Sequence, residues 1–254
     1  MEIPPLTNGF ELVYKKPQTL TETPMHYCPG CGHGVAHRVL MEVVDEMGIQ
    51  DKIIGVAPVG CSVFAYDYMN IDMQEAAHGR ASAAATGIKR VLPDRFVFSY
   101  QGDGDLAAIG TAEIVHSAAR GENITVIFIN NATYGMTGGQ MAPTTLLGQK
   151  STTCPDGRSA SVEGNPIRVC EMLATLDGPA YIARVAPTNA AGLAKAKNAI
   201  KKGFQNQLDC KGFSLIEVLS GCPARWHMSP IESLKWVEEQ MIPHYPLGEF
   251  VDRS

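Results

Sequence analysis

The stretch FVFSYQGDGDLAAIG at residues 96–110 decides the fold, because it combines a buried strand, a glycine-rich turn and the start of a helix. The apolar run RFVFSY at 95–100 lacks polar alternation, which is typical of a central parallel strand covered on both faces. In the turn at 102–105, glycines let the backbone approach a phosphate, and the N-terminus of the following helix favours anions. This unit predicts an α/β protein whose ligand lies beyond the carboxyl ends of the strands.

Helices and strands alternate on both sides of this stretch. Apolar residues at helical spacing predict helices at 35–48, 79–91, 106–119, 167–176 and 190–206. Further Val- and Ile-rich runs predict strands at 53–58, 124–130, 180–185 and 213–219. The Gly-, Thr- and Pro-rich residues 131–165 form a long connection. Helical crossovers between such strands give a doubly wound, mainly parallel sheet with helices on both faces.

Bulk properties narrow the protein class. No repeat, low-complexity tract or linker divides the 254 residues, so we expect one domain over 1–254, with residues 1–27 as an N-terminal arm. A net charge of -5 without a basic run disfavours binding to nucleic acid or membrane. No signal peptide and no apolar stretch of about 20 residues is found, which predicts a cytoplasmic protein. Seven cysteines favour metal or redox roles over a disulfide framework.

The glycine turn carries a feature that points to a divalent cation. Asp103 stands between its glycines and would repel a bare diphosphate, unless a cation lies between the carboxylate and the phosphates. The next predicted strand ends at Asn130, and the side-chain amide of Asn131 is a hard oxygen ligand. Asp103, Asn131 and a backbone carbonyl near Thr133 would complete the octahedron of Mg²⁺ with two phosphate oxygens and water.

Two other interpretations of the turn are weaker. The spacing of Gly102, Gly104 and Ala107 fits a relaxed dinucleotide fingerprint, but the acidic residue that would hold a ribose is missing after the next strand. Either motif alone would be explained by a solvated turn with a helix cap. Both motifs stand at the ends of consecutive strands, and GDG followed by a helix, a strand and NN over 102–131 resembles the thiamine diphosphate signature.

Four of the cysteines form a second candidate site. Cys28 and Cys31 have the spacing of a metal or cluster hairpin, and equally of a thioredoxin-like redox pair. Cys61 and Cys222 follow predicted strands, so four thiolates can converge on Zn²⁺ or on a [4Fe-4S] cluster. If the glycine turn binds thiamine diphosphate, a decarboxylation site lies beside these cysteines. Its carbanion-like intermediate is oxidised one electron at a time, which favours the cluster because zinc accepts no electrons. The remaining cysteines and the nearby histidines receive no role: Cys154, Cys170, Cys210, His26, His33 and His37.

Six segments together resemble the β subunit of 2-oxoacid:ferredoxin oxidoreductases, of the 2-oxoglutarate or branched-chain 2-oxo acid type. The resemblance covers most of the chain, and its motifs are CPGCGHG (28–34), VGCS (59–62), HGRA (78–81), GDGDLAAIG (102–110), NNATYGMTGGQMAPTT (130–145) and SGCPARW (220–226). It implies the thiamine diphosphate-binding type of α/β fold. It also implies a [4Fe-4S] cluster on Cys28, Cys31, Cys61 and Cys222, and Mg²⁺ on Asp103, Asn131 and Thr133.

The resemblance further implies a set of cofactor contacts. Met136 would support the bend of thiamine diphosphate, although a core-filling methionine is an equal alternative. No side chain of this chain is assigned a catalytic role, because the activating Glu is expected on a partner subunit. The residues expected to contact the cofactor are Ser62, His78, Gly79, Gly102, Asp103, Gly104, Asp105, Asn131, Thr133, Tyr134, Gly135, Met136 and Thr137.

The implied activity is oxidative decarboxylation of a 2-oxo acid to acyl-CoA and CO₂, with electrons passed through the cluster to ferredoxin. The chain has room only for the diphosphate-binding half of such a site, so we expect an α subunit, with or without a fused γ, and a ferredoxin-like δ subunit. A rival is a non-redox thiamine diphosphate-dependent decarboxylase or synthase half with structural zinc. A non-enzymatic rival is an NAD-sensing or zinc-stabilised binding module.

Overall fold

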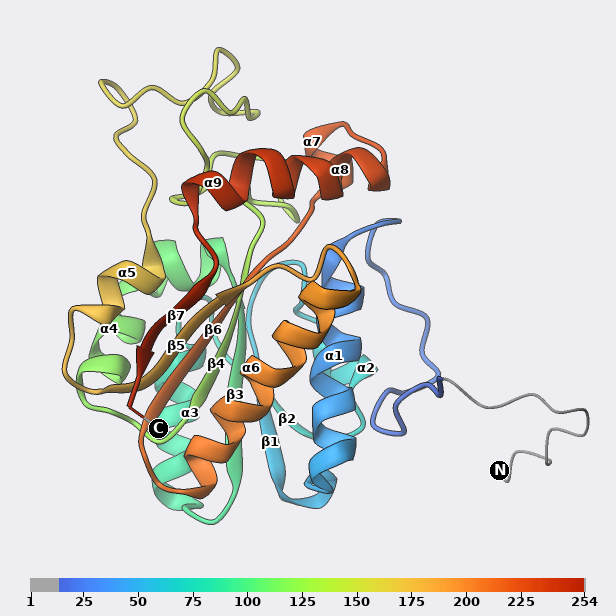
Figure 1. The fold of residues 1–254 in the computed structure, drawn as a ribbon, viewed down its shortest axis with the longest axis vertical. Coiled ribbons are helices and arrows are strands. Elements are labelled where there is room, and N and C mark those ends of the chain that lie inside the picture. Colours follow the sequence, from blue (N-terminus) through green and yellow to red (C-terminus); the bar gives the residue numbers. More distant parts are fainter. Residues whose placement is uncertain (1–13, 254) are drawn as a thin grey trace, which may run out of the picture.

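Seven strands form one sheet in the order β2-β1-β3-β4-β6-β5-β7 in the computed structural model, which describes residues 14–253 (Figure 1). The predicted N-terminal arm lies outside the described residues over 1–13. Strands β1 to β6 pair in parallel, and β7 pairs antiparallel with β5. The predicted doubly wound, mainly parallel sheet is therefore confirmed. The strands are β1 (Ile53–Ala57), β2 (Asp72–Glu75), β3 (Phe96–Gly102), β4 (Thr125–Asn130), β5 (Pro179–Val185), β6 (Phe213–Leu219) and β7 (Gly248–Asp252).

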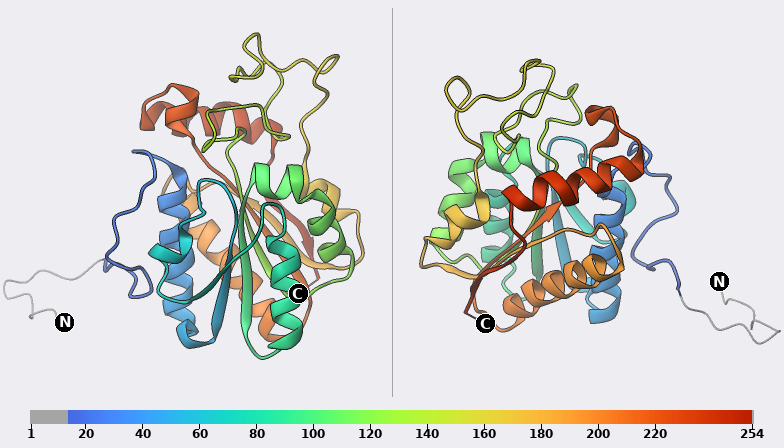
Figure 2. Two further views of the ribbon diagram at one scale, coloured as in Figure 1. Left: turned by 180° about the vertical axis from the view of Figure 1, so that it is seen from behind. Right: turned by 45° about the horizontal axis from the view of Figure 1, so that its top comes forward.

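Helices cover both faces of the sheet, as Figures 1 and 2 show. On one face lie α1 (Gly32–Met47) and α6 (Ala190–Leu208), and on the other lie α3 (Ala81–Val91), α4 (Thr111–Ala119) and α5 (Val169–Ala174). No helix within residues 14–253 combines the length and the apolar character that crossing a membrane requires. The shorter helices are η1 (Gln50–Lys52), α2 (Ala65–Tyr68), η2 (Asp105–Ile109), α7 (Pro223–Trp226), α8 (Pro230–Trp236), η3 (Val237–Met241) and α9 (Ile242–His244).

The central strands bury apolar side chains on both faces. In β4, Val126 and Phe128 pack into the core under α3 and α4, whereas Ile127 and Ile129 pack into the core under α1 and α6. All four side chains are fully buried. Successive side chains of a strand point to opposite faces, so a strand covered twice is apolar at every position. This explains why the run at 124–130 shows no polar alternation.

The predicted helix at 106–119 is wrong as one continuous α-helix. It consists of the π-helical turn η2, then Gly110, then α4. A Cβ atom on Gly110 would clash with the carbonyl oxygen of Asp105 and would lie 2.8 Å from that of Gly79. The wide turn therefore accommodates the backbone of residue 79, which packs directly against the helix. Such π-helical turns are frequent at functional sites.

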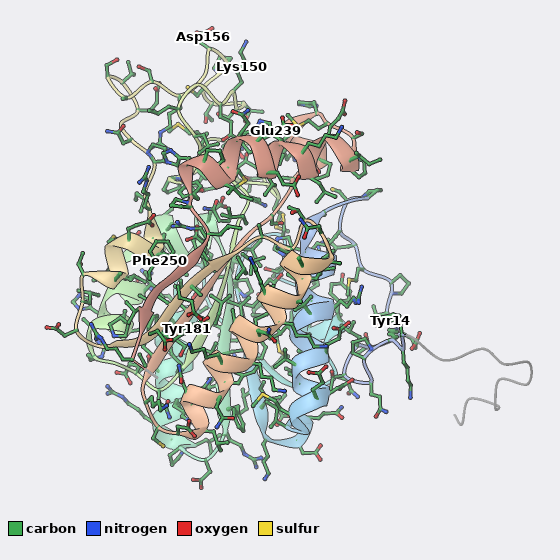
Figure 3. All side chains as sticks on the ribbon, viewed as in Figure 1. Tyr14, Lys150, Asp156, Tyr181, Glu239 and Phe250 are labelled. Atoms are coloured by element: carbon green, nitrogen blue, oxygen red, sulfur yellow. The ribbon has the colours of Figure 1, made fainter. Side chains whose placement is uncertain are left out.

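The predicted long connection after β4 contains no helix and no strand longer than an isolated bridge. It extends beyond the sheet and the C-terminal helices, and Figure 3 places Lys150 and Asp156 at its tip. The guanidinium of the buried Arg158 holds its base, because it donates hydrogen bonds of 2.9 Å to the Pro143 carbonyl and 2.7 Å to the Thr145 carbonyl. Arg158 thus ties the two ends of the connection to each other, and the Tyr245 hydroxyl near the C-terminus of the chain donates to the Thr144 carbonyl at 2.6 Å.

Residues 227–253 carried no secondary-structure prediction, yet they form helices and an edge strand. Ser229 and Glu232 make a reciprocal capping box that starts α8. Strand β7 pairs with β5, although most of its residues are exposed. Its sequence has no apolar run because it lies at the edge of the sheet.

A buried ion pair joins the strands near the carboxyl end of β4. The Arg184 guanidinium on β5 lies 2.8 Å from the Glu217 carboxylate on β6, and both side chains are fully buried. The side-chain amide of Asn130 donates to the other oxygen of Glu217 at 2.7 Å. Glu171 on α5 also pairs with Arg184 at 2.6 Å. The network therefore fixes the end of β4, from which the site extends.

Replacing Glu217 by Ala should lower the free energy of unfolding by about 2–3 kcal/mol, because it leaves the buried Arg184 Nε and the Asn130 amide without an acceptor, while Glu171 still pairs with the guanidinium. Urea denaturation followed by circular dichroism measures this change. As a control, Glu22→Ala removes the exposed Lys16–Glu22 pair and should change stability by less than about 1 kcal/mol. Equal effects of the two substitutions would contradict the structural role of Glu217.

Candidate active site

A cavity of about 230 Å³ opens at the carboxyl ends of the parallel strands. Strands β2 and β3 flank β1 on opposite sides, so the strand order reverses between β1 and β3, where ligands bind in doubly wound sheets. Every residue predicted to contact the cofactor lines this cavity except Gly79, which lies behind its wall. Further lining residues, which were not predicted as cofactor contacts, are His33, Val59, Gly60, Cys61, Ala108 and Ile109.

Asp103, Asn131 and Thr133 each direct one polar atom to the predicted magnesium site. One end of the Asn131 side-chain amide lies 3.1 Å from Oδ2 of Asp103 and 2.8 Å from the carbonyl oxygen of Thr133. Without a cation, the amide nitrogen is favoured in this position, because it donates to both oxygens. With a cation, the amide oxygen takes it, and neighbouring ligands of octahedral Mg²⁺ stand about 2.9 Å apart at metal–oxygen distances of about 2.0–2.1 Å. The donor set therefore fits Mg²⁺.

Asp103 is held in place by several donors. Its Oδ2 accepts hydrogen bonds of 2.9 Å from the Thr144 hydroxyl and 3.1 Å from the Thr133 backbone, and its Oδ1 accepts one of 3.0 Å from Gly104. Burial nevertheless raises the pKa of Asp103 to about 7. A nearby cation favours the ionised form of a buried carboxylate, so this environment suits a metal ligand.

The backbone between the two asparagines and Thr133 is strained. Ala132 has a φ of 54°, in the left-handed region that costs a residue with a side chain about 1–2 kcal/mol. Its amide donates to Oδ1 of Asn130 at 3.1 Å, and its carbonyl accepts from the Thr145 hydroxyl at 2.7 Å. These bonds hold the turn that directs both Asn131 and Thr133 toward Asp103.

Asp105 has a different environment from Asp103, although it also lines the cavity. Its Oδ1 accepts from His78 Nδ1 at 2.7 Å and from the backbone amides of Gly79 at 2.8 Å and Val59 at 3.3 Å. Its Oδ2 accepts from Gln101 Nε2 at 2.6 Å. Both oxygens of the Asp105 carboxylate, which was predicted to contact the cofactor, are therefore already hydrogen-bonded to protein donors. Through these bonds Asp105 connects the loops after β1 and β2 to β3.

The loop after Asn131 forms another wall of the cavity. The ring of Tyr134 stands about 3 Å from where a side chain at Gly104 would begin, so the loop packs closely over the glycine turn. Met136 lines the cavity and is half exposed. The core-filling alternative for Met136 is thus wrong, and its apolar side chain is available to a ligand.

The four predicted cluster cysteines gather beside the same cavity. The Gly32 amide donates to the Gly221 carbonyl at 3.3 Å, which joins the first cysteine segment to the last. A Cβ atom on Gly135 would lie 3.0 Å from the sulfur of Cys61 and 3.5 Å from that of Cys222. Cys28 is exposed, Cys31 and Cys61 are half-buried and Cys222 is buried.

Burial and the mutual repulsion of neighbouring thiols disfavour the thiolate form of these cysteines when no metal is bound. Burial, with the neighbouring Cys31, raises the pKa of Cys61 to about 12, and burial likewise raises the pKa of Cys222 to about 12. The Ser220 hydroxyl beside Gly32 is buried without a partner. No group of three or more His, Cys, Asp or Glu within residues 14–253 is arranged for a single metal ion. A cubane cluster spaces its thiolates more widely, since each binds a different iron, so the cluster stays a prediction.

The remaining candidate residues fall outside this arrangement, with one exception. Cys154 and Cys170 are buried elsewhere, and Cys210 is exposed. His33, to which no role was assigned, lines the cavity, and its Nδ1 lies 3.0 Å from the Tyr100 hydroxyl. His37, four residues later on the same helix, does not line the cavity, and nothing in the sequence shows which of the two histidines does.

The comparison with protein families defines the class. Residues 58–218, more than half of the chain, match the family described as thiamine pyrophosphate enzyme, C-terminal TPP binding domain. The fold and the glycine turn are therefore those of a thiamine diphosphate-binding domain. This match contains both the turn at 102–105 and the end of β4.

Curated and solved relatives identify the particular family. The ketoisovalerate oxidoreductase subunit VorA of Methanothermobacter marburgensis is 44% identical over 95% of this chain and 53% of its own length. The 2-oxoglutarate synthase subunit KorB of Methanocaldococcus jannaschii is 40% identical over 86% of this chain and 79% of its own. A solved 2-oxoglutarate:ferredoxin oxidoreductase from Magnetococcus marinus superposes with a TM-score of 0.77 at 25% identity, covering 96% of this chain and 87% of that chain. The chain belongs to the 2-oxoacid:ferredoxin oxidoreductase family, and it spans about half the length of its VorA relatives.

Replacing Thr144 by Val should weaken Mg²⁺ binding about tenfold, because outer hydrogen-bond partners of metal ligands typically contribute 10–100-fold to affinity. Titration of Mg²⁺ in the presence of thiamine diphosphate, followed by calorimetry, measures this effect. Thr175→Val is the matched control, since its exposed hydroxyl bonds only the Met172 carbonyl. An unchanged dissociation constant in the Thr144 variant would show that Asp103 is not the metal ligand.

Proposed function

We propose that this chain is the thiamine diphosphate-binding subunit of an enzyme that oxidatively decarboxylates a 2-oxo acid to acyl-CoA and CO₂ and passes the electrons through a [4Fe-4S] cluster to ferredoxin. The observation that carries the proposal is one cavity lined both by oxygen ligands for a magnesium ion and by a sulfur ligand for a cluster. The side chains of Asp103 and Asn131 and the Thr133 carbonyl converge in this cavity, and Cys61 forms part of its wall. Family membership supports the same activity.

The chain's residues divide into three binding roles. Asp103, Asn131 and the Thr133 carbonyl would hold Mg²⁺, and the glycine turn with Ser62 and His78 would hold the diphosphate. The loop of Tyr134, Gly135, Met136 and Thr137 would cover the rest of the cofactor and exclude water. The cluster would be held by Cys28, Cys31, Cys61 and Cys222.

The bound groups would supply chemistry that protein side chains lack: carbanion stabilisation from thiamine diphosphate and one-electron acceptance from the cluster. This chain's part is to bind and orient them. Asp103 and Asp105 are the only acidic residues among the described residues that line the cavity. The first belongs to the proposed metal site, and protein donors surround the second. The carboxylate that activates the cofactor would therefore come from an α subunit, which would also provide most of the substrate pocket.

The substrate proposed is a branched-chain 2-oxo acid or 2-oxoglutarate, with coenzyme A. The names of the relatives refer to ketoisovalerate and to 2-oxoglutarate, and the solved relative has 2-oxoglutarate, coenzyme A and succinyl-CoA bound. Ile109 and Met136 give the cavity of this chain a partly exposed apolar rim. The acceptor proposed is ferredoxin, either free or as a ferredoxin-like δ subunit.

The protein purified without oxygen, together with the subunits that accompany it, should be brown. Its visible absorbance should bleach when the correct 2-oxo acid and coenzyme A are added, because electrons then reduce the cluster. 2-Oxoisovalerate and 2-oxoglutarate, added one at a time to samples of known iron and zinc content, identify the substrate. A colourless protein that contains zinc would instead support the non-redox thiamine diphosphate enzyme.

Replacing any one of Cys28, Cys31, Cys61 or Cys222 by Ser should lower the iron content and the visible absorbance, because each thiolate would bind one iron. Cys210→Ser is the matched control, since Cys210 is exposed and lies apart from the other four. Iron analysis and the absorbance of anaerobically purified variants measure the outcome. Full iron content in the Cys61 variant would contradict the assigned ligands.

A further inference from the structure

Arg225 is tied to the loop that forms one wall of the cavity. Its Nε donates a hydrogen bond of 2.8 Å to the Gly135 carbonyl. The stem of the same side chain runs along Gly139, because a Cβ atom on that glycine would lie 3.4 Å from Cβ and 3.5 Å from Cδ of Arg225. This exposed arginine is therefore held in place from its stem to its guanidinium.

The glycine that accepts this bond also packs against two of the predicted cluster ligands. A Cβ atom on Gly135 would lie 3.0 Å from the sulfur of Cys61 and 3.5 Å from that of Cys222. The guanidinium of Arg225 and the two sulfur atoms thus surround one small residue. Charges within the Debye length of about 10 Å at 0.1 M salt are only partly screened, so the guanidinium acts on both sulfurs.

The positive charge at this position is not neutralised by a neighbour. No carboxylate within residues 14–253 pairs with Arg225, and its Nη atoms donate to no group in this range. A guanidinium also keeps its charge at every working pH. Burial, followed by the neighbouring Cys31, raises the pKa of Cys61 to about 12, whereas the charge of Arg225 acts in the opposite direction.

The reduction potential of an iron–sulfur cluster depends on the charges and hydrogen bonds around its sulfurs. Reduction adds one electron, which in the proposed reaction leaves the decarboxylated substrate on the cofactor, and no bond forms or breaks at the cluster. We propose that the Arg225 guanidinium raises the reduction potential of the predicted cluster, because a nearby positive charge stabilises the more negative, reduced form. The inference rests on the proposed function, since it requires a cluster on Cys61 and Cys222.

Three substitutions separate the charge of Arg225 from its hydrogen bond. Gln carries its N–H on Cδ as Arg does, so Arg225→Gln can keep the bond to Gly135 without the charge. Arg225→Lys keeps the charge but has a methylene group in place of Nε. Arg225→Met keeps the stem along Gly139 and has neither property.

Lys211→Gln is the matched control, because it also removes one exposed positive charge. Lys211 precedes β6, whereas Cys222 follows the end of this strand. At about 3.3 Å per residue, the seven residues of β6 separate the two positions by about 23 Å, well beyond the Debye length.

The deciding measurement is a redox titration of the full complex without oxygen, with dithionite as reductant, followed by electron paramagnetic resonance. The signal of this cluster is the one that Cys61→Ser removes, which distinguishes it from clusters on other subunits. Arg225→Gln and Arg225→Met should lower its midpoint potential by about 30–60 mV, the equivalent of an about three- to tenfold smaller constant for one-electron reduction. Arg225→Lys and Lys211→Gln should keep the wild-type potential.

An unchanged potential in Arg225→Gln would overturn the proposal. An equal decrease in Arg225→Lys would also overturn it, because the effect would then come from the position of the loop and not from the charge. Iron analysis shows first which variants hold the cluster, and if Arg225→Gln holds none, Arg225→Met decides.

Loss of iron from both uncharged variants would show that Arg225 acts on cluster assembly instead of on the potential, and would refute the proposal as well. Absence of iron from the wild-type complex is a different outcome, since it would refute the cluster of the proposed function itself.

Discussion

The cavity is organised around the buried carboxylate of Asp105. Strands β1, β2 and β3 end side by side where the strand order reverses. The loop after β1 bonds this one acceptor through Val59, the loop after β2 through His78 and Gly79, and β3 itself through Gln101. Burial of a carboxylate is unfavourable unless its lone pairs are satisfied, and here donors from three segments satisfy them. The positions of the diphosphate-binding elements therefore depend on a single charge.

The opposite side of the cavity is fixed from the interior of the sheet. The Arg184–Glu217 pair holds the side chain of Asn130, and Asn130 in turn holds the strained backbone of Ala132. The rigid strands thus fix one end of the turn that carries Asn131 and Thr133, and the Thr145 hydroxyl, which donates to the Ala132 carbonyl, fixes it from the long connection. Packing deep in the core thus contributes directly to the geometry of the proposed metal site.

Much of the fold was predictable because its strands are buried on both faces, and parallel strands bring their carboxyl ends together. That rule alone places the glycine turn, Asn131 and Cys61 in one region. The different environments of Asp103 and Asp105 were not predictable, because these residues stand two positions apart in one motif. Their difference comes from Thr144 on one side and from Gly79 and Val59 on the other, which are distant in sequence. The break at Gly110, the edge strand β7 and the place of His33 likewise depend on contacts between distant segments.

The direct contact between Gly79 and Gly110 requires a residue without a side chain at both positions. Each glycine occupies the space that a side chain on the other would need, since a Cβ atom on Gly79 would lie 2.7 Å from the amide of Gly110. A larger residue at either position would push the segment of His78 away from η2. The distance between the loop after β2 and η2 is therefore set by two backbones in contact, and no side chain at either position can adjust it.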